Sequence, residues 1–150
     1  MNFLVDTSVV SHFAPGRSPI APERITWALA NQHRWFLPTI AALEIEQGIR
    51  RLERVGSSRR AADLSRWFAG ILDNFRSRIV DLDLKAALHA AAMSDRLVAM
   101  GRHPGFADVL IAASADAHGY GILSRNLRHF EPTGVPVFDP FSADPSKLPT

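Results

Sequence analysis

FLVDTSVV, residues 3–10, is the stretch that decides the fold. Three apolar residues lead directly into Asp6, which is followed by two hydroxyl residues and a second apolar pair. A short apolar run that meets a helical pattern is typical of an interior strand followed by a helix. In α/β folds built from such units, ligands bind at the carboxyl ends of the parallel strands. Asp6 stands at that position.

The rest of the chain repeats the order of strand and helix. Further short apolar runs predict strands at 34–38, 78–82, 120–124 and 135–139, the last on a sheet edge because it contains Pro136. Helical patterns of 3.6-residue period lie between them, at 7–13, 22–32, 39–54, 59–75, 83–100 and 106–118. We therefore expect one α/β domain over residues 1–150, with a mostly parallel sheet of four to five strands flanked by helices. We expect about 140–150 to form a loose C-terminal tail.

Composition limits the classes of protein and site. The 150 residues include no cysteine, which excludes disulfides and thiolate metal sites and suits a cytoplasmic chain. No apolar stretch approaches the roughly 18 residues of a membrane span, and Asp6 interrupts the N-terminal apolar run, so neither a membrane span nor a signal peptide is expected. Lys occurs only at Lys85 and Lys147, so 15 of the 17 basic residues are Arg. This balance permits a nucleic-acid partner without requiring one.

One of three glutamates in the predicted helix at 39–54 lacks a local partner. Glu46 has Arg50 four residues on, and Glu53 has Arg50 three residues back, so both fit surface ion pairs. Glu44 has no cation on its own face of the helix and borders the apolar stripe. A carboxylate in that position needs a partner from elsewhere in the fold.

A third carboxylate, Asp108, falls in the first turn of the predicted helix at 106–118. A favourable interaction with the helix dipole would by itself explain Asp108, as helix capping would explain Asp6. The almost wholly apolar residues 109–113 leave no exposed face beside Asp108, which favours a buried position. Asp116, two turns further, is expected at the surface.

Carboxylates gathered at one sheet edge repel each other unless they are protonated or neutralised by a cation. Hard oxygen ligands without cysteine or paired histidines suit Mg²⁺ or Mn²⁺. Ions held in this way commonly serve phosphoryl chemistry. The acidic residues therefore favour a metal-dependent reaction at a phosphate ester.

Four blocks of the chain together resemble the PIN-domain ribonucleases, and among them the VapC/FitB-type toxins of bacterial toxin–antitoxin modules. The blocks are FLVDTS (3–8), the Glu early in the helix after the second strand, FADVLIAASA (106–115) and GILSRNLRHF (121–130), and the ending GVPVFDPF (134–141) is similar too. The resemblance implies a parallel sheet flanked by helices, RNA cleavage that depends on Mg²⁺ or Mn²⁺, homodimerisation and inhibition by an antitoxin protein. It assigns metal binding to Asp6, Glu44 and Asp108, and so chooses Glu44 over Glu46.

The fourth block departs in part from the family pattern. Asn126 stands where relatives often have Asp, and it is included with the three acids in the predicted catalytic site, although it could also be a simple turn residue. His129 stands where many relatives also have Asp, and its alternative is a solvated surface group. Ser124 occupies a position where relatives carry a Thr or Ser that supports the acids. The hydroxyl of Thr7 could orient Asp6.

Two other classes of function compete with a nuclease. A non-catalytic PIN module would bind RNA or a protein partner without cleaving it. Intact Asp6, Glu44 and Asp108 argue against that reading, whereas the departures at 126 and 129 keep it open. A phospho-receiver domain would need a phospho-acceptor Asp after the third strand and a Lys after the last strand. Neither Lys of this chain follows a suitable strand.

Overall fold

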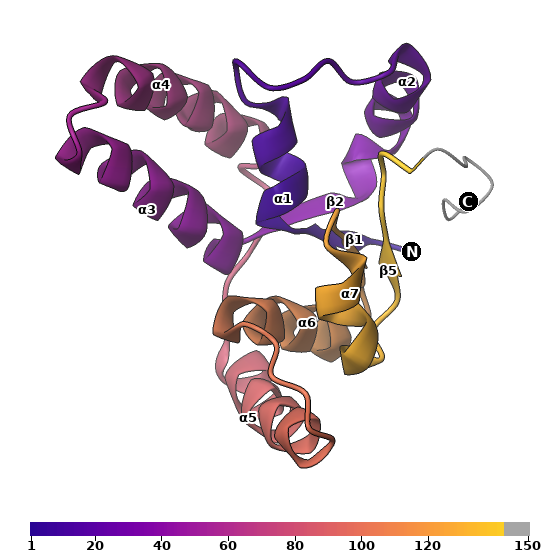
Figure 1. The fold of residues 1–150 in the computed structure, drawn as a ribbon. Coiled ribbons are helices and arrows are strands. Elements are labelled where there is room, and N and C mark those ends of the chain that lie inside the picture. Colours follow the sequence, from indigo (N-terminus) through magenta and orange to yellow (C-terminus); the bar gives the residue numbers. More distant parts are fainter. Residues whose placement is uncertain (143–150) are drawn as a thin grey trace.

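Strands and helices alternate along the chain, as Figure 1 shows for a computed structural model that describes residues 1–142. Within this range the strands are β1 (Phe3–Val5), β2 (Trp35–Pro38), β3 (Ile79–Val80), β4 (Gly121–Leu123) and β5 (Val137–Phe138). The α-helices are α1 (Thr7–Val10), α2 (Pro22–Asn31), α3 (Thr39–Arg54), α4 (Ser58–Asn74), α5 (Leu84–Ala99), α6 (Phe106–His118) and α7 (Leu127–Phe130). Short 3₁₀ turns are η1 (Ser11–Phe13), η2 (Gln32–Arg34) and η3 (Glu131–Thr133).

The first strand of the sequence is the central strand of the sheet. The five-stranded sheet has the order β3-β2-β1-β4-β5, and every neighbouring pair is parallel. Leu4 pairs with Phe36 of β2 on one side and with Ile122 of β4 on the other. Parallel neighbours require crossover connections, which the helices supply. The α/β fold expected from the sequence is confirmed, and β5, next to Pro136, is an edge strand as predicted.

Side chains of β1 alternate between two apolar cores. Phe3 and Val5 belong to a core that α2, α3 and α4 complete, whereas Leu4 belongs to a core formed with α5, α6 and α7. Helices therefore cover both faces of the sheet (Figure 1). Burying a Phe, Leu or Val side chain stabilises the fold by about 1.5–3 kcal/mol. Because β1 is anchored on both faces and both edges, the residue that follows it is held in a fixed position.

The end of α6 sets the position of β4. Gly119 has a positive φ of 69°, and its N–H donates to the Asp116 carbonyl, while the Tyr120 N–H donates to the Ala115 carbonyl. Glycine adopts this left-handed conformation without steric cost, which ends the helix and turns the chain back into the sheet. The predicted helices at 39–54 and 106–118 have these bounds in the structure, whereas the predicted helix at 7–13 is divided into α1 and η1.

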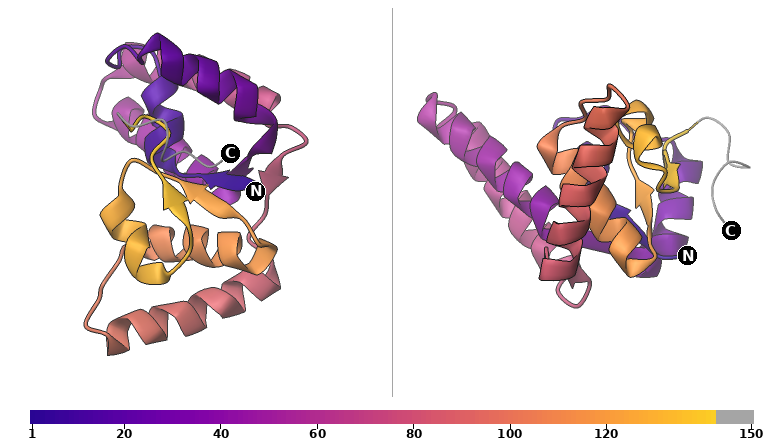
Figure 2. Two further views of the ribbon diagram at one scale, coloured as in Figure 1. Left: turned by 90° about the vertical axis from the view of Figure 1, so that its right-hand side faces the viewer. Right: turned by 90° about the horizontal axis from the view of Figure 1, so that it is seen from below.

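Two peripheral features complete the fold. The α3–α4 pair extends away from the remainder of the molecule as an arm (Figure 2). Near the C-terminus Pro140 is buried, and the ring centroid of Phe141 lies 5.6 Å from that of Phe13. The rest of the expected loose tail, residues 143–150, lies outside the described residues. No helix in residues 1–142 is both long and apolar enough to cross a membrane.

Candidate active site

Asp6 is held at the carboxyl end of β1 by its backbone and by one of its carboxylate oxygens. Its N–H donates to the Leu123 carbonyl at 2.8 Å, which joins the ends of β1 and β4. Its Oδ2 accepts hydrogen bonds from Ser8 Oγ at 2.6 Å and from Ser124 Oγ at 2.8 Å, and the Ser8 N–H is 3.4 Å away. Asp6 is thus the N-cap of α1 and is only 3% exposed. These donors fix the orientation of the carboxylate.

The other carboxylate oxygen of Asp6 remains available. No residue between 1 and 142 donates a hydrogen bond to Oδ1. In the same range Trp35 Nε1 is the only side-chain nitrogen or oxygen that is both shielded from solvent and without a hydrogen-bond partner. Since Oδ1 of Asp6 also has no partner, it must be accessible to solvent. Asp6 therefore combines one oxygen that the protein fixes with one oxygen that can bind a ligand.

Asp108 lies in the first turn of α6, and its side chain is 19% exposed. Its Oδ2 lies 3.0 Å from His129 Nδ1, and a Cβ atom added at Gly105 would approach this oxygen to 3.3 Å. Burial and, secondarily, the negative charge of Asp6 raise the pKa of Asp108, whereas His129 opposes this rise. Asp6 and Asp108, which are distant in sequence, therefore interact as like charges at one edge of the sheet.

Glu44 is partly buried in α3 and receives a hydrogen bond from Thr7 Oγ1 at 2.6 Å. This contact corrects the expectation that Thr7 orients Asp6, because Ser8 has that role. Consecutive residues of a helix point about 100° apart, so the two neighbouring hydroxyls reach different carboxylates. The sequence analysis missed Ser8, although a Ser two residues after an N-cap Asp can bond back to the cap.

Only part of the fourth block, GILSRNLRHF (121–130), contacts the acidic residues in the structure. Ser124 and His129 contact Asp6 and Asp108, respectively. Asn126 is exposed, and its backbone N–H donates to Ser124 Oγ at 2.9 Å. Its side chain makes no hydrogen bond with any residue from 1 to 142, so the structure places the backbone of Asn126, but not its amide group, in the network.

The donor set fits a hydrated Mg²⁺ or Mn²⁺ ion better than a fully enclosed one. No three carboxylate or imidazole groups in residues 1–142 are close enough to form a ready metal cluster. Mg²⁺, however, is usually bound by one or two carboxylates and keeps several waters. The mutually repelling carboxylates of Asp6 and Asp108, with Oδ1 of Asp6 open, match that requirement. Glu44 accepts its hydrogen bond from Thr7 and, among the described residues, forms no group of three with these two acids.

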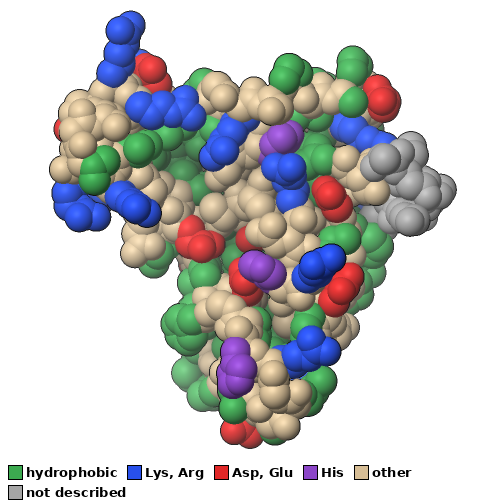
Figure 3. Space-filling model, in the orientation of Figure 1, with side chains coloured by type: hydrophobic (Ala, Val, Ile, Leu, Met, Phe, Trp, Pro, Cys, Tyr) green, Lys and Arg blue, Asp and Glu red, His purple; other side chains and the backbone are tan. Residues whose placement is uncertain are grey.

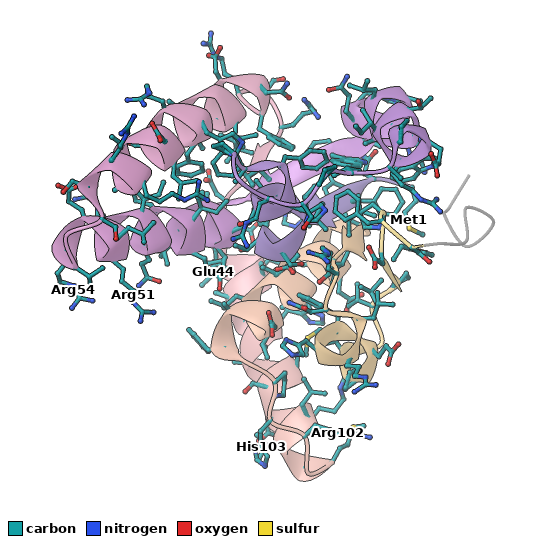
Figure 4. All side chains as sticks on the ribbon, turned by 45° about the horizontal axis from the view of Figure 1, so that its top comes forward. Met1, Glu44, Arg51, Arg54, Arg102 and His103 are labelled. Carbon is teal, nitrogen blue, oxygen red and sulfur yellow. The ribbon has the colours of Figure 1, made fainter. Side chains whose placement is uncertain are left out.

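Basic side chains surround the acidic group. On the face shown in Figure 3, acidic and histidine side chains gather in the middle, with Arg or Lys side chains above and below them. A cavity of about 200 Å³ adjoins Glu44 and is lined also by Arg17, Arg60 and Trp67. Figure 4 shows Glu44 toward the start of α3 and Arg51 and Arg54 toward its far end. An anionic ligand would meet positive charge on both sides of the carboxylates.

Known proteins are similar to this chain over most of its length. The model of the PIN domain family matches residues 3–134. VapC ribonuclease Y4jK of Sinorhizobium fredii is 27% identical over 92% of this chain and 96% of that protein. The tRNA(fMet)-specific endonuclease VapC of Shigella flexneri is 26% identical over 89% of this chain and 93% of that protein.

Solved structures show the same similarity. FitAcB from Neisseria gonorrhoeae has a TM-score of 0.76 at 27% identity, over 92% of this chain and 97% of that chain. DNA-bound VapBC from Salmonella typhimurium has a TM-score of 0.76 at 23% identity, over 93% and 98% of the two chains. The second likeness concerns the fold alone.

Proposed function

The chain belongs to the PIN-domain family, and from this premise we propose that it is a metal-dependent endoribonuclease that acts as the toxin of a toxin–antitoxin pair. The observation that carries the proposal is the pair of Asp6 and Asp108. These two acids come from distant parts of the chain, interact as like charges, and are each oriented by a side chain from another element. A fold gains no stability from such repulsion, so the arrangement is best explained by a cation and a phosphate substrate.

The proposed cofactor is Mg²⁺ or Mn²⁺. Asp6 and Asp108 would hold it directly, and Glu44 would reach it through a water. When bound, the ion would neutralise charge on the phosphodiester oxygens and lower the pKa of a bound water. Ser8, Ser124 and His129 keep the two aspartates in place, so that little reorganisation is needed when the ion binds.

The protein's own groups have separate roles in this hydrolysis. A water attacks the phosphorus, the bond to the departing oxygen breaks, and the water loses a proton. Glu44 is positioned by Thr7, which suits it to accept that proton. We assign no chemical step to Asn126, because its exposed amide makes no contact with the acids.

An antitoxin protein is the proposed regulatory partner. Support comes from the structural relative FitAcB and from the cavity beside Glu44, which combines Arg17 and Arg60 with the apolar ring of Trp67.

A homodimer is also proposed. Leu84 and Leu88 lie one turn apart on α5 and are 74% and 64% exposed, and exposed apolar side chains of this kind are typical of protein interfaces.

The activity is tested by incubating purified chain with RNA in Mn²⁺, in Mg²⁺ and in EDTA. We expect cleavage only with a divalent ion, and none from Asp6→Asn prepared in the same way, which controls for contaminating nucleases. Equal cleavage by this variant would contradict the proposal. RNA binding without cleavage would instead support the non-catalytic PIN module.

A further inference from the structure

A basic pocket adjoins Asp108. It has a volume of about 300 Å³ and is lined by Arg102, His103, Arg128 and His129 over a floor of proline and glycine. None of the residues that line it is acidic. We call these four basic side chains and the space between them the loop pocket. His129 both lines the loop pocket and contacts Asp108 at 3.0 Å, so the loop pocket lies next to the carboxylate of Asp108.

The backbone around the loop pocket is well braced. Gly101, with a φ of 71°, ends α5, and the N–H of Arg102 donates to the Leu97 carbonyl at 2.8 Å. This turn directs the connection between α5 and α6 toward the start of α6. Arg96 Nη2 donates to the Thr133 carbonyl at 2.9 Å, which ties α5 to η3. Since η3 carries Pro132, which also lines the loop pocket, this hydrogen bond connects α5 to a segment of the pocket lining.

Three of its four basic side chains are unpaired among the residues that the structure describes. Within residues 1–142, the side chains of Arg102, His103 and Arg128 make no hydrogen bond or ion pair, whereas Arg66 and Arg76 on the outer surface pair with Asp63 and Asp73. Figure 4 shows Arg102 and His103 at the tip of the connection between α5 and α6. Basic groups that share a concave site without an acid create a positive potential that attracts an anion.

Given the RNA cleavage proposed above, on which this inference rests, we propose that the loop pocket binds a backbone phosphate of the RNA next to the phosphate that is cleaved. An RNA strand that is positioned at Asp6 and Asp108 and continues past His129 reaches the loop pocket, because the pocket and Asp108 share that residue. Arg side chains can contact a phosphate through two parallel hydrogen bonds. Phosphate contacts of this kind fix the register of a nucleic acid without reading its sequence.

This role affects RNA binding more than the chemical step. Removing the Arg side chains should raise the KM for RNA and leave kcat nearly unchanged, because the loop pocket touches a phosphate that does not react. A residue that only supported the fold would instead lower the melting temperature.

The test compares two double variants that lose the same charge. Arg102→Gln/Arg128→Gln removes two cations from the loop pocket, and Arg66→Gln/Arg76→Gln removes two exposed cations, one on α4 and one in the turn after it. Binding of a 5′-fluorescein-labelled, unstructured RNA 12-mer is followed by fluorescence anisotropy in EDTA. We expect the loop-pocket variant to bind about tenfold more weakly than the control variant. The slope of log K against log salt should fall by about 0.7, the value for one lost contact with single-stranded nucleic acid.

Equal affinity of the two double variants would overturn the inference, whether or not the wild type cleaves RNA. So would an acidic peptide of ten glutamates that binds more tightly than the RNA and depends on Arg102 and Arg128, since it would point to a protein ligand. If the wild type binds RNA through the loop pocket but shows no metal-dependent cleavage, the proposed activity fails and the inferred phosphate site stands. Unchanged melting temperatures verify that both double variants are folded.

Discussion

The two ends of α6 both bring aspartate and histidine together, yet with opposite consequences. At the C-terminal end, His89 Nε2 lies 2.6 Å from Asp116 Oδ2, and His118 Nε2 lies 3.3 Å from Asp83 Oδ2. Each carboxylate there has its own imidazole. At the N-terminal end, Asp108 has His129 but also feels the charge of Asp6.

This difference suits the C-terminal end of α6 to a structural role and the N-terminal end to the proposed reaction. At the C-terminal end, Lys85 Nζ also donates to the Ala117 carbonyl, and cations at that end of a helix are stabilising. At the N-terminal end, Asp108 has His129 at 3.0 Å but is also repelled by Asp6, and under the proposed function a metal ion would bind these two carboxylates. Aspartate and histidine side by side therefore do not identify a metal site, whereas a carboxylate such as Asp108, whose pKa is raised by burial and by a neighbouring carboxylate, does indicate one.

The largest expected effect separates the two ends by activity. Asp108→Asn should lower metal-dependent RNA cleavage by at least about 100-fold, because changing even a group that supports a metal ligand costs 10–100-fold. Asp116→Asn, the matched change at the other end of α6, should remain active. Glu46, which pairs with Arg50 at 2.9 Å, provides a second control as Glu46→Gln. Initial rates of cleavage of one RNA substrate are measured for all three variants. If Asp116→Asn lost as much activity as Asp108→Asn, the two ends of α6 would not differ in function.

Metal binding should make the same distinction without any reaction. Saturating Mn²⁺ should raise the melting temperature of the wild type and of Asp116→Asn, since a ligand at 100 times its Kd stabilises by about 2.7 kcal/mol. For a domain of this size that corresponds to roughly 5–10 °C. The rise should be smaller in Glu44→Gln and absent in Asp6→Asn. Scanning calorimetry with Mn²⁺ or EDTA measures it, and an equal rise in Asp6→Asn would mean that Asp6 is not a ligand.

Without metal, the repulsion at the N-terminal end should be measurable as lost stability. The pKa of Asp108 is raised on folding, so the folded state binds its proton more tightly than the unfolded state does. Stability therefore falls as the pH rises from the unfolded value of 3.8 through the raised folded pKa. In EDTA, Asp108→Asn should melt higher than the wild type at pH 7, by about 2–4 °C for each kcal/mol.

That advantage should shrink as the pH falls toward the unfolded value of 3.8 and disappear below it, where Asp108 of the wild type is protonated in both states. Melting curves from pH 3.5 to 8 test this dependence. A constant difference between the two proteins across this range would show that the repulsion is not its cause. Asp116→Asn, which loses a paired carboxylate, should show no gain at pH 7.

The smallest effect is expected at the C-terminal end. The side chains of His89 and Asp116 are 40% and 53% exposed, and exposed pairs contribute about 0.2–1 kcal/mol. His89→Gln should therefore lower the melting temperature by no more than about 4 °C and leave RNA cleavage unchanged. A double-mutant cycle with Asp116→Asn isolates the pair. A coupling energy above about 2 kcal/mol would show that the His89–Asp116 pair contributes far more than an exposed ion pair does.

The fold could be predicted largely because its strands are short apolar runs with clear limits. Pro136 correctly indicated an edge strand, and the helix at 106–118 had its stop signal in Gly119. The third strand was predicted over 78–82, but only Ile79–Val80 pairs, with Leu37 and Pro38 of β2. Its length depends on how far the neighbouring strand extends, which the local pattern does not contain.

The candidate site was predictable where a residue's position follows from one element. Asp6 at a strand end and Asp108 in a first helical turn are of this kind, and the predicted Glu46–Arg50 pair is present. The partners of Thr7 and Ser8 were not predictable, because they depend on how α1 is rotated against α3 and β4. The contact of His129 with Asp108 depends likewise on the docking of α7, a four-residue helix with little periodicity.

The central position of β1 has a consequence for synthesis of the protein. β1 leaves the ribosome long before β4, which pairs with it, and long before Ser124, which binds Asp6 from 118 residues away. A nascent chain that stops before β4 leaves one edge of β1 without its partner and Asp6 without one of its two hydroxyl donors. Domains generally fold as units as they emerge. Under the proposed function, a cell that translates this message meets no active nuclease until synthesis has passed β4 and Ser124.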